Sequence, residues 1–235
     1  MSPKNQHFTR LLDALKDSEI FGHMTTEEQR ALLARMHRVV WKADTIKKGK
    51  EMVTNFHFVI SGRLKVYQIN QRSGREFTLS MLSKGRVFDV FYLLDNEVHD
   101  VHWQTIDEVE ILSIPMDHMR DLIGEYPKMH SEFLRYMSNV MHYMEKSAAD
   151  VSLHNTLVRL SNLLLRNING QTQELQLVND LPNDELAGLV GTTRAVVNRH
   201  LQELKRTGAI DVNRRHIDIK NIQKLIAIAE EKYSV

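Results

Sequence analysis

The pattern of hydrophobic and polar positions divides the chain into a β-rich stretch with helical stretches on either side. Near the N-terminus, hydrophobic residues recur at helical spacing over residues 6–16, and Thr25 with Glu28 three residues later suits the capping box of a second helix. From His37 to Ile114, short β-prone runs alternate with turn residues. The expected strands are residues 39–41, 57–60, 63–69, 77–81, 101–105 and 109–114. Regularly spaced short strands of this kind indicate a sandwich or barrel.

Helical spacing returns after Pro115. Residues 116–126 predict a short helix that stops before Pro127, and residues 127–149 predict a long one. The long helix carries a hydrophobic stripe at spacings of four, three and four, which comprises Phe133, Met137, Val140 and Met144. Such a stripe can join two helices in a coiled coil. The alternative is that the long helix packs on its own β-domain.

A hinge is expected at residues 150–152, where Asp150 or Ser152 could cap the next helix. Leucines at spacings of three and four predict that this helix starts at Leu153 and continues to Ile168. A final helix is expected over residues 221–233.

Two amphipathic helices that meet at Gly191 are the most informative feature of the chain. The hydrophobic positions are Leu186, Ala187 and Val190 in the first helix and Val197, Leu201 and Leu204 in the second. Two helices that cross steeply over a short turn need a small residue at their contact and a residue that tolerates positive φ at the bend. Ala187 and Gly191 occupy these positions, so the pattern predicts a helix-turn-helix.

A basic hairpin follows the second of these helices. Residues 209–212 and 217–219 are β-prone, and the polar turn between them contains Arg214 and Arg215. A helix-turn-helix followed by such a hairpin is typical of a winged helix. The polar side chains on its outer face suit phosphates and base edges of a DNA major groove. The predicted DNA-binding residues are Thr193, Arg194, Asn198, Arg199, Arg214 and Arg215. The alternative is a purely structural helical hairpin with solvated arginines.

Charge supports nucleic-acid binding only locally. The chain has 31 Lys and Arg against 30 Asp and Glu, a net charge of +1. Residues 192–216, however, hold six basic and two acidic residues, a net charge of +4. Attraction to phosphate is therefore expected at the winged helix rather than over the whole protein.

Composition excludes several other chemistries. The chain has no cysteine, which excludes disulfides, cysteine nucleophiles and cysteine-held metal clusters. The N-terminus lacks the hydrophobic core of a secretory signal, and no stretch approaches the roughly 20 apolar residues that span a bilayer. We therefore expect a cytoplasmic protein with no membrane partner. We also expect that it is not an enzyme, because an enzyme would not need the predicted winged helix.

A family resemblance is carried by the run FHFVISGRLKVYQINQRSGREFTLSMLSKGRVF at residues 56–88. This run resembles the cyclic-nucleotide-binding β-roll of the Crp-Fnr family of bacterial transcription regulators, in which an FVISG strand and turn precede a GRE hairpin and a later GxxF turn. Gly49, Gly62, Gly74 and Gly85 match the turn glycines of that family. The resemblance extends over almost the whole chain.

The resemblance implies an α+β fold in three parts. These are an antiparallel, jelly-roll-like β-roll sensor at residues 1–126, a long dimerisation helix at 127–149 and a winged helix-turn-helix at 150–235. It implies a homodimer that binds a near-palindromic operator in double-stranded DNA, and contact with RNA polymerase if the protein is an activator. It also favours a dimer interface over intramolecular packing for the stripe on the long helix. The family usually has a Glu at the position of Ala195, where it accepts a hydrogen bond from cytosine.

The nucleotide-binding cassette of the family is altered. Members that bind cyclic AMP have a Phe-Gly-Glu turn and, about nine residues later, an Arg followed by a small hydroxyl residue. Here the turn reads Phe88, Asp89 and Val90, and the later position falls near His99 and Asp100. Unpaired negative charge beside a buried phosphate costs several kcal/mol. We therefore expect no binding of cyclic AMP, and the effector stays unidentified, either an unknown small molecule or none.

Three histidines keep two alternatives open. His57, His99 and His102 could belong to a haem-based or metal-based sensor, or to a cupin-like metal-dependent enzyme. Residues three apart on a strand face opposite sides, so His99 and His102 converge only across a bend. We therefore expect no metal and no cofactor. A third alternative, a sensor that binds a partner protein through the long helix, leaves Arg194 and Arg199 unexplained.

Overall fold

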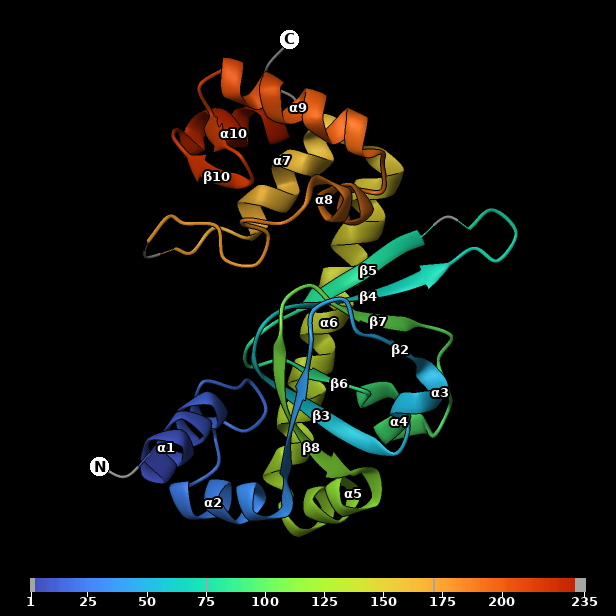
Figure 1. The fold of residues 1–235 in the computed structure, drawn as a ribbon, viewed down its shortest axis with the longest axis vertical. Coiled ribbons are helices and arrows are strands. Elements are labelled where there is room, and N and C mark those ends of the chain that lie inside the picture. Colours follow the sequence, from blue (N-terminus) through green and yellow to red (C-terminus); the bar gives the residue numbers. More distant parts are fainter. Residues whose placement is uncertain (1–2, 75, 171, 231–235) are drawn as a thin grey trace. The chain divides into compact units, whose positions relative to one another are not determined.

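The computed structural model describes residues 3–74, 76–170 and 172–230, which form two compact units (Figure 1). The first unit contains most of the chain up to residue 142. The second contains residues 70–78 and the chain from residue 143 onward. Among the described residues, no helix is long and apolar enough to cross a membrane.

Two four-stranded sheets form the β-roll (Figure 1). The first has the order β1-β8-β3-β6, and the second has the order β2-β7-β4-β5. The strands are β1 (His37–Trp41), β2 (Ile46–Lys48), β3 (Asn55–Ser61), β4 (Leu64–Ile69), β5 (Glu76–Leu82), β6 (Val87–Phe88), β7 (His102–Thr105) and β8 (Val109–Pro115). All six predicted strands are confirmed within one or two residues. The sequence missed β2 and β6, which are too short to show an alternating pattern.

Strand β3 separates two hydrophobic cores because successive side chains on a strand point to opposite faces. Phe56 and Phe58 belong to the core that packs against helices, whereas Val59 belongs to the core inside the roll. The inner core also contains Phe88 and Trp103. The strand is therefore apolar on both faces, which explains its continuous hydrophobic run.

Six helices accompany the roll. They are α1 (Pro3–Lys16), α2 (Thr26–Arg35), α3 (Gly49–Met52), α4 (Val90–Asp95), α5 (Met116–Glu125) and α6 (Lys128–Leu153). The predicted capping box is confirmed, since the Thr25 side chain accepts from the Glu28 N–H at 3.2 Å and the Glu28 carboxylate accepts from the Thr25 N–H at 2.6 Å. Gly49 begins α3 where the chain passes His99 closely, since a Cβ there would lie 2.1 Å from the His99 carbonyl oxygen.

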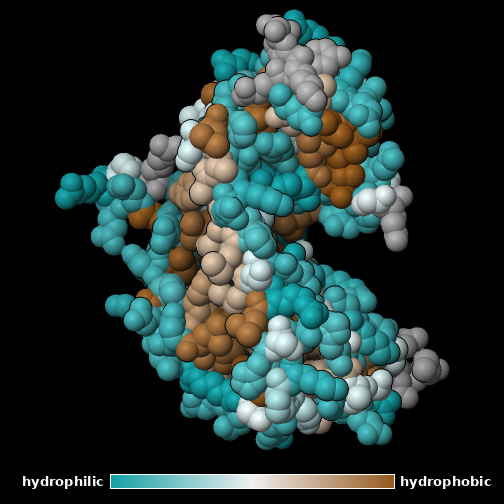
Figure 2. Space-filling view, turned by 180° about the vertical axis from the view of Figure 1, so that it is seen from behind, coloured by the Kyte–Doolittle hydropathy of each residue, from teal (hydrophilic) through white to brown (hydrophobic). Residues whose placement is uncertain are grey.

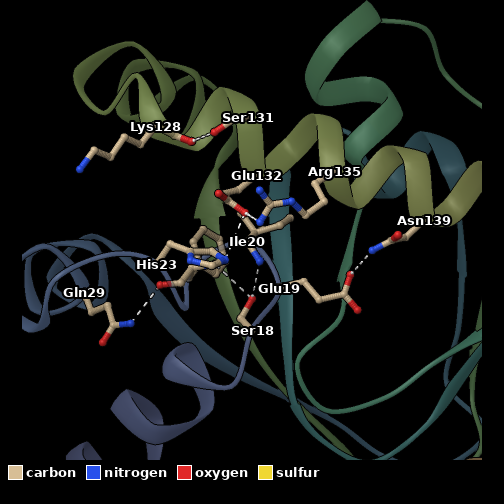
Figure 3. A network of polar contacts seen from close by, with 11 residues as sticks. Ser18, Glu19, Ile20, His23, Gln29, Lys128, Ser131, Glu132, Arg135 and Asn139 are labelled. Carbon is tan, nitrogen blue, oxygen red and sulfur yellow. Dashed lines mark hydrogen bonds and ion pairs between the residues drawn. The ribbon is translucent and has the colours of Figure 1, made fainter.

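A polar network joins the segment after α1 to one face of α6 (Figure 3). The buried Glu132 carboxylate accepts from Arg135 at 3.0 Å and lies 3.3 Å from His23 Nε2. Asn139 Nδ2, two turns further along α6, donates to Glu19 at 3.4 Å. This face of α6 is therefore covered by its own subunit.

The second unit contains the winged helix. Its elements are α7 (Thr156–Arg166), α8 (Asn183–Val190), α9 (Arg194–Arg206), β9 (Ile210–Asn213), β10 (His216–Ile219) and α10 (Ile222–Ala229). The two predicted helices around Gly191 and the hairpin after them are confirmed. The predicted final helix ends at Ala229, and residues 231–233 of that prediction lie outside the described residues.

The hinge prediction at residues 150–152 was wrong. Helix α6 continues to Leu153, and Asn155 caps α7 by accepting from the N–H groups of Leu157 and Val158. Asp150 instead accepts a hydrogen bond from Asn162 and forms an ion pair with Arg166, both on α7. Leu153 does not begin the next helix and is 74% exposed.

Candidate nucleic-acid interface and sensor site

Helices α8 and α9 form a tight turn because each buries the predicted hydrophobic face. Leu186, Ala187 and Val190 are buried on α8, and Val197, Leu201 and Leu204 are buried on α9. Gly191 ends α8 with φ of 71°, a left-handed conformation that glycine adopts at little cost. The Thr193 hydroxyl then caps α9 by accepting from the Val196 N–H at 3.4 Å. The turn and the Thr193 cap therefore set the start of α9 at Arg194, the first of its outward-facing side chains.

The outward face of α9 carries the predicted polar residues. Thr193, Arg194, Asn198 and Arg199 are all exposed. Arg194 lies 3.4 Å from Asp184 in an exposed ion pair, and the Asn198 side chain accepts a hydrogen bond from Asn183. Exposed contacts of this kind contribute little free energy, so both side chains are available to exchange them for DNA.

The β9–β10 hairpin presents the other two predicted arginines. Arg214 and Arg215 are exposed at its tip, between the paired residues Asn213 and His216. Lys205 holds the hairpin against α9, because its Nζ lies 2.7 Å from Asp211 and donates to the Val212 carbonyl at 3.1 Å. Lys205 therefore holds β9, the strand that leads to the basic tip, close to α9.

His200 fixes α9 from its buried side. One ring nitrogen lies 2.8 Å from the Thr156 hydroxyl on α7, and the other lies 3.1 Å from the Glu203 carboxylate. The helical spacing places His200 on the buried face with Val197 and Leu201, but it does not identify the partners Thr156 and Glu203.

The interior of the β-roll contains a buried carboxyl group at the altered cassette. Asp89 adopts φ of 67°, and its side chain is 5% exposed. Burial raises the pKa of Asp89 to about 8. The imidazole of His57 lies beside it, with Nε2 4.0 Å from Asp89 Oδ2.

His57 does not neutralise Asp89. Burial, with a smaller contribution from His37, lowers the pKa of His57 to about 3, so its imidazole is neutral near pH 7. His57 Nδ1 lies 2.7 Å from the Ser113 hydroxyl, and the imidazole stacks on Phe88 at 4.7 Å between ring centres.

The other predicted pocket residues separate into two groups. Phe88 and Val90 are buried beside Asp89, whereas Asp100 is exposed. The expectation that two carboxylates face one buried site is therefore wrong for Asp100. His99 lies before β7 with its ring 5.0 Å from that of Phe91, and His102 lies on β7 with its ring 5.3 Å from that of Tyr67. The described residues contain no group of three or more histidine, aspartate and glutamate side chains arranged to hold a metal ion.

Part of the predicted dimer stripe on α6 packs against the rest of the same chain instead of facing outward. Phe133 is 3% exposed in the helical core of its own subunit, and Met137 and Val140 pack against that core. Phe133 therefore cannot face a partner, and its assignment to the dimer interface was wrong. Met144 is 43% exposed.

Comparison with known proteins decides the family. The sequence pattern of the cyclic nucleotide-binding domain matches residues 38–126, and that of the Crp-like helix-turn-helix domain matches residues 158–228. The chain is 26% identical over 188 residues to a CRP-like cAMP-activated global transcriptional regulator of Mycobacterium tuberculosis, covering 78% of this chain and 84% of the relative. The chain belongs to the Crp-Fnr family of transcription regulators. It therefore regulates transcription and carries a helix-turn-helix DNA-binding domain.

Other relatives of this Crp-Fnr regulator agree. It is 25% identical over 197 residues to an anaerobic regulatory protein of Aggregatibacter actinomycetemcomitans, covering 81% of this chain and 75% of that one. The fold is similar to that of a CooA variant from Carboxydothermus hydrogenoformans, with a TM-score of 0.70, 22% identity and coverage of 85% and 90%. It is also similar to that of FixK2 from Bradyrhizobium japonicum, with a TM-score of 0.72, 15% identity and coverage of 81% and 96%. The matched families and relatives are regulators rather than enzymes.

Two features of this Crp-Fnr regulator were missed in the sequence. Lys84 and Arg86, basic residues close to the cassette in the sequence, point outward and form exposed ion pairs with Asp17 at 2.9 Å and Glu19 at 2.8 Å, and these partners could not be read from the sequence. A second hydrophobic stripe also runs along α6, and it includes the exposed residues Leu134 and Met141. Its spacing of three and four was visible in the sequence, but which stripe faces outward depends on how the helix packs.

Proposed function

We propose that this regulator is a homodimer that binds a near-palindromic operator sequence-specifically and does not respond to cyclic AMP. Its proposed parts are the β-roll sensor at residues 1–126, the dimerisation helix at 127–149 and the DNA-binding domain at 150–235. As an activator it would contact RNA polymerase, and its work on the chromosome would place it in the cytoplasm.

DNA binding through α9 is supported by one observation above all. The exposed face of α9 begins at the Thr193 cap and carries Arg194, Asn198 and Arg199, while the opposite face is fully buried. Arginine pairs in two-point contacts with guanine, and asparagine with adenine, in the major groove. Arg214 and Arg215 on the adjoining hairpin suit phosphates.

Selection of bound sequences from random double-stranded DNA tests this function. We expect enrichment of a near-palindrome whose half-sites lie about one helical turn apart, roughly 10 base pairs. Arg194→Ala is expected to cost roughly 1–3 kcal/mol on the selected site. Arg30→Ala, which removes an exposed arginine on α2, is the matched control and should bind as the parent does. Equal binding by Arg194→Ala and the parent would remove the assignment.

Dimerisation is proposed through the exposed face of α6. This face carries hydrophobic residues at spacings of three, four, three, four and three, namely Leu134, Met137, Met141, Met144, Ala148 and Val151. Leu134 and Met141 are 72% and 66% exposed. A band of hydrophobic surface follows this helix in Figure 2. A hydrophobic repeat of about 3.5 residues matches the contact stripe of a two-stranded coiled coil.

The loss of cyclic AMP binding is proposed from Asp89. In members that bind the nucleotide, a glycine at this position lets the backbone approach the phosphate. Here a buried carboxyl group occupies the position, and Lys84 and Arg86 point outward in exposed ion pairs. A cyclic phosphate would be buried beside this carboxyl group without a compensating cation. Millimolar cyclic AMP should leave the melting temperature unchanged, and a rise of several degrees would contradict the proposal.

A further inference from the structure

Several unpartnered polar atoms lie on the segment that begins at the altered cassette. Among the described residues, six buried side-chain nitrogen or oxygen atoms have no hydrogen-bond partner. Four of them lie on the segment from Asp89 to Trp103, namely Asp89 Oδ2, His99 Nε2, His102 Nδ1 and Trp103 Nε1. A buried polar atom without a partner costs free energy, so a group of them calls for a ligand or another explanation.

Asp89 is the most demanding of these groups. Its side chain is only 5% exposed, yet the neighbouring nitrogen, His57 Nε2, is 4.0 Å away, too far for a hydrogen bond. The two basic residues closest in sequence are engaged by Asp17 and Glu19. A buried carboxyl group in this position lacks the cation that would favour its charged form.

An aromatic cluster is centred on Phe88, the residue before Asp89, and it includes His57, a nitrogen-bearing neighbour of Asp89. The Phe88 ring lies 4.7 Å from that of His57, 6.0 Å from that of Trp41 and 6.2 Å from that of Trp103. Aromatic faces carry partial negative charge and attract cations, whereas they offer nothing to a phosphate. Trp103 adds one unpartnered N–H donor.

We propose that the β-roll interior binds a small organic cation, a protonated amine. Its N–H groups donate to Asp89, and its apolar part packs among Trp41, Phe88 and Trp103. A hydroxyl or carbonyl oxygen on the same molecule would accept from Trp103 Nε1. This inference rests on the proposed function, because the amine would act as the effector of the regulator. It specifies which chemical class of ligand the β-roll sensor would bind.

Tryptophan fluorescence reports on this site directly. The chain has two tryptophans, and both lie in the cluster around Phe88. The full-length protein is titrated with methylamine, benzylamine, tyramine and putrescine, and with benzyl alcohol and benzoate as neutral and anionic counterparts. We expect at least one amine to change the emission and to raise the melting temperature by several degrees at saturation. Benzyl alcohol and benzoate should do neither.

Asp89→Asn supplies the decisive variant, because it keeps the shape of the side chain and cannot ionise to pair with an ammonium group. It should weaken binding of the active amine at least about tenfold, a loss of about 1.4 kcal/mol. Asp100→Asn, which changes an exposed carboxylate nearby, is the matched control and should bind as the parent does. Melting curves without ligand establish that both variants fold.

Three outcomes would overturn the inference. They are no response of the parent to any of the four amines, an unchanged response in Asp89→Asn, or an equal response to benzoate. DNA binding by the same preparations separates this result from the proposed function. If the protein binds its operator but no amine, only the ligand assignment is defeated. If it binds an amine but no operator, only the proposed function is defeated.

Discussion

Asp150, near the end of α6, forms an ion pair with Arg166, at the end of α7, and so joins two helices on either side of a short turn. Asn162 adds a second contact by donating to Asp150 at 2.9 Å. Because the carboxylate is buried, both contacts are shielded from water. Within the second unit, these side-chain contacts therefore hold the end of α6 against α7.

The first prediction concerns this contact. Asp150→Ala leaves Arg166 and Asn162 without their shared acceptor and should lower the free energy of unfolding by roughly 1–3 kcal/mol. Urea denaturation followed by circular dichroism measures the change. Asp121→Ala, at an exposed position on α5, is the control and should stay within about 0.5 kcal/mol of the parent. Equal midpoints for the two variants would show that the ion pair contributes nothing.

A second prediction concerns Ala195, an exposed residue in the first turn of α9. Glutamate at this position can accept from the N4 amino group of cytosine, so Ala195→Glu should sharpen the selected operator at one position by roughly 1–3 kcal/mol. Ala195→Gln is the uncharged control, and it should not favour cytosine. Sequencing of DNA selected by the three proteins measures the effect. Identical selected sites would show that position 195 does not face a base.

The third prediction is a pH dependence set by Asp89 and His57. Burial raises the pKa of Asp89 from 3.8 to about 8 and lowers the pKa of His57 from 6.5 to about 3. The folded protein holds the Asp89 proton more tightly than the unfolded chain, so stability from this group falls as pH rises from 3.8 to 8. His57 has the opposite pH dependence. The folded protein binds the His57 proton less tightly than the unfolded chain does, so stability from this group falls as pH drops from 6.5 to 3.

Between pH 6.5 and 8, therefore, only Asp89 of these two groups changes its protonation. The parent should lose on the order of 1–2 kcal/mol of unfolding free energy over this interval relative to Asp89→Asn. Urea denaturation of both proteins at several pH values measures the difference. Parallel stability curves for the two proteins would mean that the carboxyl group is ionised throughout.

A fourth prediction tests the dimer. Met141→Lys places a charge in the middle of the exposed stripe on α6, and burying it between two helices costs several kcal/mol. Sedimentation at micromolar concentration should show a dimer for the parent and a monomer for the variant. Ala149→Lys adds the same charge at an exposed position beside the stripe, and it should leave the dimer intact. A parent that sediments as a monomer would refute the proposal outright.

The strands, the capping box at Thr25 and the turn at Gly191 could all be predicted from the sequence because each depends on residues close together in the chain. A hydroxyl and a carboxylate three residues apart are sufficient for the capping box, and one glycine is sufficient for the left-handed turn. The same holds for the exposed face of α9, since its buried face is defined by three hydrophobic residues at helical spacing.

Two predictions failed because a helix does not reveal from its own sequence which neighbour it contacts. Residues 133–151 carry two hydrophobic stripes side by side, and only the packed structure assigns Phe133 to the inner core and Met141 to the outer face. Asp150 has the residue type of a cap, but Arg166, 16 residues later in the chain, lies close enough to bind it.

The sequence by itself determined the local elements, the winged helix and the altered residues at the nucleotide cassette, because these follow from residue types and their spacing. Only the tertiary structure decided that Asp89 is buried without a cation, that Asp100 is exposed and that Lys84 and Arg86 are bound by acidic residues after α1. The reason is physical. Burial and charge pairing depend on distances in space between residues that are far apart along the chain, and no local pattern encodes those distances.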